Sequence, residues 1–521
     1  MAKTQGDSCD VLIIGGGISG AAIAAECTQR GLSVQLCDRA DVGGASSSQS
    51  DQILPGALHF LRKHNLPYFN KAIKEKALLK QRAPHLFCER PFVVVPSANE
   101  PNSPISRIWL WLFQHWLQGG ERPSMAKRQA NATQLAPLQQ AAHSPWVMCE
   151  SMIDDARLVI ENLLVAAKHN ALIRPSHTFL SSHRNSGLWC SRLQCPDGNE
   201  LTIQSRCLIN AAGAQVADIQ ENIEKADSRC WIELKRKLFL IIPKFYQGDQ
   251  GYLLELEPQR GPVNITPYQD HYCLVSTVTG VGKAAAPAKA SEVEIEDLLA
   301  ILSSHFNTSF TRDSVLRSYV IQQPVYTDDC EATTDGIEDY ALDLNGADGR
   351  SPLISVFGGS FATHRAMAQE AVEMLGQYIE LGEPPAKAEP LPGGDVEPAS
   401  FDQFILRTAS QFPWLPSQLL NHYCRTYGAR TQLLLSDAKS LADLGPQLTP
   451  GLHQREAEFL LRYEWVSSAE DILWRRTRLG LYADSDDSER LQRWVCEHLP
   501  SPSATQAYTM WCNSVSPRQM H

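Results

Sequence analysis

A glycine-rich turn between two hydrophobic strands is the feature that most constrains this chain. The stretch CDVLIIGGGISGAAIAAECTQRGLSVQLCDR predicts a strand, a tight turn, a helix over about residues 19–29 and a second strand that ends at Asp38. Gly15, Gly17 and Gly20 form the pattern GxGxxG. In this pattern the first glycine permits the turn, the second lets the backbone approach a pyrophosphate, and the third lets the helix pack on the strand. An acid at Asp38 suits the ribose hydroxyls, so the sequence predicts a Rossmann-like dinucleotide site.

Later segments favour FAD as the dinucleotide. Small residues and hydroxyls follow Asp38, RCLINAAGA (206–214) predicts a strand that ends beside the nucleotide, and PLISVFGGSFATHRAMAQEAVEML predicts a strand, a glycine turn and a helix. The positive end of that helix would favour an anionic reduced flavin. Sites assembled from such distant segments are typical of two-domain flavin oxidoreductases. The cofactor residues that these segments add are Ser46, Ser47, Ser48, Ala211, Gly213, Gly358, Gly359 and Ser360.

Composition excludes several other classes of protein. The 521 residues are 43% hydrophobic, enough for two or three domains, and the net charge of −11 argues against a nucleic-acid partner. The 14 cysteines are scattered without a CxxC pair, so we expect neither a metal site nor a disulfide framework. The N-terminus does not resemble a signal peptide and no apolar run has the length of a membrane span, which favours a cytoplasmic protein.

The pattern along the chain predicts an α/β fold with an added helical domain. We expect residues 1–385 to form an FAD-binding Rossmann-like domain interleaved with a substrate domain at about 65–150 and 220–345. The strand-like pieces FVVVP, FLIIP and HYCLVSTVT predict a mixed sheet in the substrate domain. The Pro/Gly-rich residues 386–398 are interpreted as a linker, and helical spacing of apolar residues over 399–521 predicts an all-helical C-terminal domain.

Several motifs resemble those of one family. DVLIIGGGISGAAIAAE, MIDDARLVIENLL, INAAGA, SVFGGSFATHR, LPGGD and EWVSSAEDILWRRTRLGL together are similar to the FAD-dependent, quinone-linked glycerol-3-phosphate dehydrogenases over nearly the whole chain. The resemblance implies that a secondary alcohol of sn-glycerol 3-phosphate passes a hydride to flavin, and that the electrons then go to a quinone. That chemistry needs cations for a phosphate dianion and a base for the hydroxyl proton.

The residues expected to bind phosphate depart from the family's pattern. The segment SDQILPGALHFL (50–61) falls on S-S-K-L-I-H-G-G-L-R-Y-L, and the ionisable residues of that pattern fall at Gln52, Pro55, His59 and Phe60. The pattern's V-R-P arginine falls at Gln323, its T-R-D-Y arginine at Glu338, its F-G-G-K lysine at Ser360 and its G-S-H motif at Leu238 and Phe239. Each charge-assisted contact contributes about 1.5–3 kcal/mol. We therefore expect glycerol 3-phosphate to be a poor substrate of a pocket lined by Gln52, Pro55, Phe60, Phe239 and Gln323.

Three residues are candidates for catalysis: His59, Glu338 and His364. Each also has a plain interpretation, because a histidine on an apolar helix face is commonly structural and a lone glutamate commonly lies on the surface. If Glu338 contacts the ligand, a small, less charged molecule or an amine would suit the pocket.

Two other functions stay open. A phosphate site rebuilt from His59, His364 or the residues Lys235, Arg236 and Lys237 would restore glycerol-3-phosphate oxidation. A flavin-binding partner or regulator without catalysis would also keep the nucleotide motif, while the substrate-binding residues of the family's pattern would be lost.

The segment ISRIWLWLFQHWLQGG (105–120) has two interpretations. Its tryptophans are typical of a helix at a membrane interface, which would place the protein peripherally on the cytoplasmic face of the inner membrane with access to quinone. The same spacing is typical of a buried helix in the substrate domain.

Overall fold

The structure is a computed structural model, and it describes residues 8–54, 66–97, 128–139, 145–226, 228, 230–256, 261–282, 289–327, 339–346, 351–385, 388–396 and 401–499. Four predicted site residues lie outside the described residues, as does the tryptophan-rich segment 105–120; the four are Pro55, His59, Phe60 and Glu338. Among the described residues, the helices are all too short or too polar to cross a membrane.

The first sheet carries the glycine-rich turn. Its strand order is β15-β16-β9-β1-β2-β6, and β7 and β8 extend it from β9. The pairs β1–β2, β1–β9, β9–β16 and β2–β6 are parallel, whereas β15 and β16 are antiparallel. The strands are β1 (Ser8–Ile14), β2 (Val34–Cys37), β6 (Leu172–Arg174), β7 (Thr178–Asn185), β8 (Leu188–Gln194), β9 (Glu200–Asn210), β15 (Tyr340–Asn345) and β16 (Leu353–Gly358).

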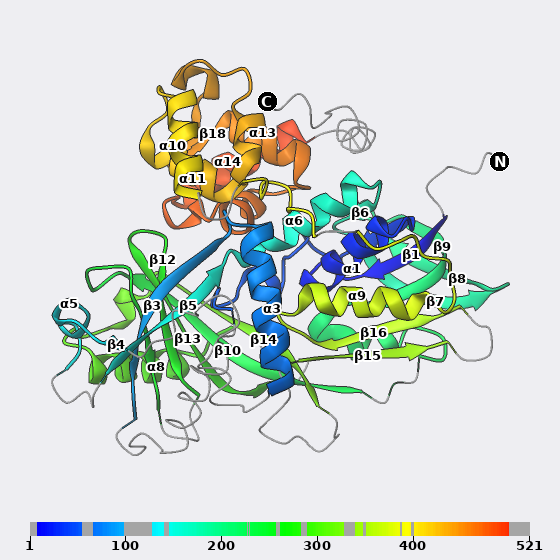
Figure 1. Ribbon diagram of the computed structural model, residues 1–521, viewed down its shortest axis with the longest axis horizontal. Coiled ribbons are helices and arrows are strands. Elements are labelled where there is room, and N and C mark those ends of the chain that lie inside the picture. Colours follow the sequence, from blue (N-terminus) through cyan, green and yellow to red (C-terminus); the bar gives the residue numbers. More distant parts are fainter. Residues whose placement is uncertain are drawn as a thin grey trace.

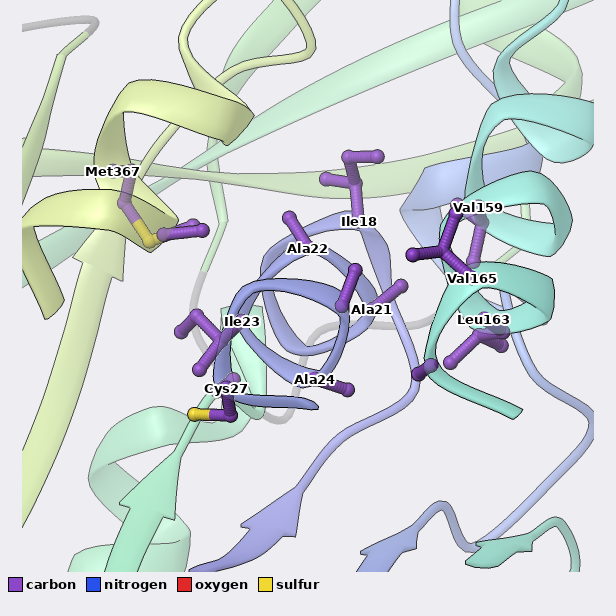
Figure 2. Close-up of a cluster of buried hydrophobic side chains, with 14 of the residues drawn as sticks. Ile18, Ala21, Ala22, Ile23, Ala24, Cys27, Val159, Leu163, Val165 and Met367 are labelled. Atoms are coloured by element: carbon purple, nitrogen blue, oxygen red, sulfur yellow. The ribbon is translucent and has the colours of Figure 1, made fainter. Parts of the chain in front are cut away.

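Helix α1 (Ile18–Gln29) packs between two other helices of this half. Figure 2 shows α1 with Val159 and Leu163 of α6 (Asp155–Lys168) on one side and Met367 of α9 (His364–Leu375) on the other. The small side chains of α1 are fully buried and allow this close packing. Since α1 begins directly after the glycine turn, its burial fixes the position of that turn.

The second sheet has eight strands in the order β14-β10-β13-β12-β11-β3-β5-β4. It contains both parallel and antiparallel neighbours, because β11 pairs with β3 in parallel and the β10 pairs are antiparallel. The mixed sheet predicted for the substrate domain is confirmed. Its strands are β3 (Phe87–Val95), β4 (Arg128–Gln129), β5 (Trp146–Ile153), β10 (Trp231–Pro243), β11 (Gly251–Leu254), β12 (Val263–Tyr268), β13 (Tyr272–Gly282) and β14 (Arg317–Thr327).

One face of the second sheet is apolar and the other is partly polar. Helix α8 (Glu292–His305) covers the apolar face, where Leu238 and Leu240 join its core. Helix α3 (Leu66–Arg82) contacts both halves of the chain: Ile73 packs with the other face of the second sheet, and Glu75 pairs with Arg365 of α9.

The C-terminal residues form the predicted set of helices. Figure 1 shows them gathered on one side of the molecule, next to α6 and the ends of β3 and β5. The elements are α10 (Phe401–Gln411), α11 (Ser417–Tyr427), α12 (Thr431–Leu434), α13 (Gln454–Tyr463), the π-helical turn η8 (Asp471–Arg476) and α14 (Ser485–His498), with a small two-stranded sheet of β17 (Gln447–Thr449) and β18 (Leu452–His453). Their core contains Tyr423, Tyr427 and Leu460, all fully buried.

Buried ion pairs attach the C-terminal helices to the first half. Arg157 of α6 forms a two-pronged pair with Glu464, whose Oε1 also accepts from Arg430 Nη1 at 2.7 Å. The side chains of Arg157 and Glu464 are 1% and 0% exposed. Burial alone would raise the pKa of Glu464, but Arg157 and Arg430 lower that pKa to about 2.

We expect the substitution Glu464→Gln to lower the free energy of unfolding by about 3–5 kcal/mol, because it removes the buried carboxylate that Arg157 and Arg430 share. The measurement is urea denaturation followed by tryptophan fluorescence. Glu200→Gln is the control, since its pair with Arg192 is half exposed, and its effect should stay below about 1 kcal/mol.

The effect of Glu464→Gln should also depend on pH. Because the folded pKa is depressed, the stabilisation is complete above the unfolded pKa of about 4.3 and is lost as the pH falls towards the folded pKa of about 2. If the difference in the free energy of unfolding between the variant and the wild type did not become smaller across this acid range, the assignment of the charge to Glu464 would be contradicted.

Candidate functional site

The glycine turn between β1 and α1 is built as its sequence predicts. Gly15 has a φ of +106°, and a Cβ atom there would lie 2.4 Å from the carbonyl oxygen of Ala211. A Cβ atom on Gly20 would lie 1.9 Å from the carbonyl oxygen of Gly15, so only glycine lets α1 approach the turn. Gly17 caps α1 without a side chain, and of the first helical turn the Ile18 N–H donates to Ser47 Oγ, so the amides that follow it are the ones a ligand could use.

The predicted acid and the serine segment meet this turn. Asp38 directly follows β2, and its Oδ2 accepts from Gly16 N–H at 2.7 Å while its Oδ1 accepts from Ala40 N–H at 2.9 Å. Burial raises the pKa of Asp38, and the two amides oppose that rise. Ser46–Ser48 form a 3₁₀ turn, η1, in which Ser47 Oγ accepts from Ile18 N–H at 3.1 Å.

Two more segments reach the same end of the first sheet. Ala211 continues β9 with its N–H donating to the carbonyl of Ile14 at 2.9 Å, and Gly213 (φ +59°) follows it. Gly358 and Gly359 have φ values of +73° and +103° and connect β16 to α9. The structure therefore brings the predicted cofactor residues to the carboxyl ends of β1, β2, β9 and β16, where ligands of such sheets bind.

Hydroxyl groups connect the turn after β16 to α3. Ser360 Oγ lies 3.1 Å from Tyr68 Oη and 3.2 Å from Thr363 Oγ1. Tyr68 and Thr363 are buried, so the position at which the family's pattern carries a lysine is here part of an uncharged hydrogen-bonded chain.

We call the segment of residues 50–61 the substrate wall. Its described part, residues 50–54, faces the polar side of the second sheet. Asp51 forms an ion pair with Lys237 of β10, and its Oδ2 accepts from Asn264 Nδ2 at 3.1 Å. The other oxygen of Asp51 is buried without a hydrogen-bond partner. Lys237 is therefore close to the wall, but its charge is balanced.

The next wall residue, Gln52, contacts the C-terminal helices. Its φ is +64°, and with the amide oxygen as acceptor that oxygen lies 2.8 Å from Arg478 Nη2. Arg478 also forms ion pairs with Asp154 and Asp155 at the start of α6. The wall residue that replaces the pattern's lysine is thus bound to an arginine that two carboxylates already neutralise.

Phe239 and Gln323 lie on the same face of the second sheet as Lys237. The register between β10 and β14 pairs Phe239 with Tyr319 and Lys235 with Gln323. The Phe239 and Tyr319 rings stack with centroids 4.9 Å apart. Phe239 is completely buried, which suits a structural role better than direct ligand contact.

His364 is the first residue of α9, and its ring is buried. Its Nδ1 lies 2.6 Å from the carbonyl oxygen of Phe361, whereas its Nε2 is buried without a partner. Burial, with Arg82 and Arg365 nearby, lowers the pKa of His364 to about 4. The imidazole is therefore neutral at neutral pH and a weak base, and its catalytic role stays a prediction.

Sequence reasoning did not assign roles to several residues that the structure places at the wall. Asp154 and Asp155 stand in MIDDARL and Arg478 in WRRTRLGL, so the motifs marked them, but nothing in either motif indicates that the two segments meet. The sequence marks Lys237 only as part of a basic triplet, residues 235–237. Its neighbour Arg236 points to α8 and binds Glu294, away from the wall.

Comparison with known proteins decides the family. Residues 10–336 match the family model "FAD dependent oxidoreductase", and residues 385–499 match "C-terminal domain of alpha-glycerophosphate oxidase". A glycerol-3-phosphate dehydrogenase of Pseudomonas aeruginosa is 33% identical over 495 residues, which cover 94% of this chain and 96% of the relative. The chain belongs to the FAD-dependent glycerol-3-phosphate dehydrogenase family.

Other relatives within this family differ in the substrate that their names give. The D-erythritol 1-phosphate dehydrogenase of Brucella abortus is 31% identical to this dehydrogenase over 94% of the chain and 98% of the relative.

The structure of the Bacillus halodurans glycerol-3-phosphate dehydrogenase with FAD has a TM-score of 0.71 at 20% identity and covers 97% of this chain and 94% of its own. That likeness confirms the fold predicted from the sequence.

The cofactor of this flavoenzyme is FAD, and the turn residues fit it. Gly17 and the uncapped amides of α1 would hold the pyrophosphate, and Asp38 would accept hydrogen bonds from the ribose. The segments around Ser47, Gly213 and Gly359 would surround the flavin, which supplies a two-electron acceptor when bound.

We expect Asp38→Asn to weaken FAD binding by about 10- to 100-fold, because it removes a charged acceptor of about 1.5–3 kcal/mol. Titration of the apoprotein with FAD, followed by quenching of flavin fluorescence, measures the dissociation constant. Asp10→Asn is the control, since Asp10 binds Ser33 and Arg206 away from the turn. Equal affinities of the two variants would contradict the role of Asp38.

Proposed function

We propose that this flavoenzyme oxidises a small neutral or cationic molecule by hydride transfer to FAD, and that glycerol 3-phosphate is a poor substrate. The observation that carries the proposal is the charge balance at the wall. Around Asp51 and Gln52, the cations Lys237 and Arg478 face the three carboxylates of Asp51, Asp154 and Asp155. This cluster has one carboxylate more than it has cations.

A phosphate dianion would find an unfavourable environment in such a cluster. Gln52 and Ser360 bind Arg478 and Tyr68 respectively and carry no charge, and Gln323 is also uncharged. A buried phosphate needs charge-assisted donors to replace its hydration. A neutral hydroxyl compound or an amine has no such requirement, and the buried, unpartnered oxygen of Asp51 is an acceptor for either.

The predicted role of Glu338 in ligand binding remains part of this proposal, as do those of His59, Pro55 and Phe60. Carboxylates would hold an amine substrate. The amine would react with the flavin in its neutral form, since an uncharged amine gives up a hydride most readily. Contacts with the wall would orient it.

The second candidate is a polyol-phosphate dehydrogenase with a rebuilt phosphate site. It is supported by the names of the Pseudomonas and Brucella relatives and by Lys237, whose side chain lies at the wall. For this function, a substrate phosphate would have to displace Asp51 from Lys237.

Anaerobic mixing with candidate substrates tests the proposal. The flavin absorbance near about 450 nm should bleach with a neutral alcohol or an amine. Glycerol 3-phosphate should give a rate lower by on the order of a thousandfold, the effect of three missing charge-assisted contacts. Rapid bleaching by glycerol 3-phosphate or erythritol 1-phosphate would support the second candidate. Bound flavin that no compound reduces would support a non-catalytic flavoprotein.

We further expect Asp51→Asn to improve the binding of glycerol 3-phosphate about tenfold, because the substitution leaves the charge of Lys237 unbalanced at the wall. The measurement is the dissociation constant from the perturbation of the flavin spectrum. Glu294→Gln is a matched control, since it unpairs the neighbouring Arg236 on the opposite face of the same sheet. An equal effect of both variants would indicate a general change of charge and contradict a local role of Lys237.

A further inference from the structure

We infer that Arg478, in the C-terminal helical region, is a positioning residue for the substrate wall of the flavin site. The side chain fixes residues 50–52 through direct and carboxylate-mediated contacts. The C-terminal region thereby acts on the site without contributing a residue that touches the reacting atoms. The inference concerns the construction of the site, so it holds for whichever substrate the enzyme takes.

The position of Arg478 is over-determined by its contacts. The residue follows the π-helical turn η8 and has a φ of +58°, a left-handed conformation that a non-glycine side chain rarely adopts. Its guanidinium donates to Asp154 Oδ1 at 2.9 Å, to Asp154 Oδ2 at 3.2 Å and to Tyr268 Oη at 3.2 Å, and it is also paired with Asp155. It therefore joins three parts of the chain: the C-terminal region, α6 and β12.

Asp155 extends this contact to the wall. One of its oxygens pairs with Arg478, and the other accepts from Ser50 N–H at 2.9 Å. Asp155 is completely buried, so the orientation of its carboxylate is set by these partners and by its own helix. Without Arg478, the two adjacent carboxylates at the start of α6 would repel each other, and the oxygen that holds Ser50 would lose its orientation.

Gln52 makes the direct contact. Its amide oxygen accepts from both terminal nitrogens of Arg478, at 2.8 and 2.5 Å, and its own φ of +64° is also left-handed. The main-chain oxygen of Gln52 accepts from Ile153 N–H at 2.9 Å. The wall thus changes direction at a strained residue whose side chain is bound by the arginine and whose main chain is bound by β5.

Other arginines of the C-terminal region do not reach the wall in the described residues. Arg476 binds both oxygens of Asp41, and Arg430 binds Glu464.

Arg317 joins β14 to the C-terminal region by stacking on Trp474, 3.6 Å from guanidinium carbon to ring centroid, and by pairing with Glu470. An arginine that served only as an anchor between domains would resemble Arg317.

Hydrogen exchange of the FAD-bound protein, read by mass spectrometry, separates positioning from anchoring. The wall peptide, residues 45–54, contains the amides of Ser50, Gln52 and Leu54, which donate to Asp155, Ser50 Oγ and the carbonyl of Ser151. We expect Arg478→Gln to raise exchange in this peptide at least tenfold and to change the visible circular dichroism of bound FAD. Arg478→Lys should restore both in part, because it keeps the charge but not the fork.

Arg317→Gln is the matched control and should leave the wall peptide and the flavin signal unchanged, even if it lowers the melting temperature. Gln52→Ala keeps all ion pairs of Arg478, so it tests the wall contact if Arg478→Gln does not fold; it should raise exchange in the wall peptide alone. Wild-type exchange of the wall peptide in Arg478→Gln or Gln52→Ala would overturn the inference. A rise in Arg478→Gln spread evenly over the chain would equally overturn it, because it would assign Arg478 to stability only.

Discussion

The structure depends on a set of buried arginine–carboxylate pairs between the C-terminal helices and the nucleotide-binding half. Arg157 binds Glu464, Arg476 binds Asp41, and Arg478 binds Asp154 and Asp155. Apart from Asp154, which is 30% exposed, these side chains are buried, so removal of one member leaves a buried charge with too little compensation. The helices are consequently held in one orientation relative to α6 and to the loop after β2. Apolar packing alone would define this orientation less precisely.

These pairs also determine the electrostatics of the candidate site. At the described part of the wall, Lys237 and Arg478 are bound to carboxylates, and the cluster around Asp51 and Arg478 carries an excess of negative charge. The composition alone, with more acidic than basic residues, does not reveal this arrangement. The proposal for a neutral or cationic substrate therefore rests on which charges are paired, rather than on how many the chain contains.

Family membership and substrate preference are separate questions in this protein. The glycine turn, Asp38 and the segments around Ala211 and Gly359 are intact, and these are the residues that we expect to bind FAD. Gln52, Gln323 and Ser360 stand where we expect the family's pattern to carry cations, and two of these residues have hydrogen-bond partners that fit their uncharged side chains. The hydrogen-bonded chain from Tyr68 to Thr363 is what a pocket adapted to a less charged ligand would contain.

The sequence by itself determined the nucleotide-binding turn, because its requirements are local. Gly15 and Gly20 are needed for a backbone conformation and a close approach within a few residues, and the same local spacing indicated the helices of the C-terminal region. The mixed sheet and the FAD cofactor followed from strand-like segments and motifs of this kind.

Only the tertiary structure decided the chemistry of the wall. Asp51 meets Lys237 across 186 residues, and Asp155 meets Arg478 across 323, so no window of sequence could indicate that these charges are paired. The lowered pKa that makes His364 a weak base has the same origin, since it comes from burial of the ring within the fold and from the nearby charges of Arg82 and Arg365. Local geometry is encoded in neighbouring residues, whereas the electrostatic state of a buried group depends on every segment that packs around it.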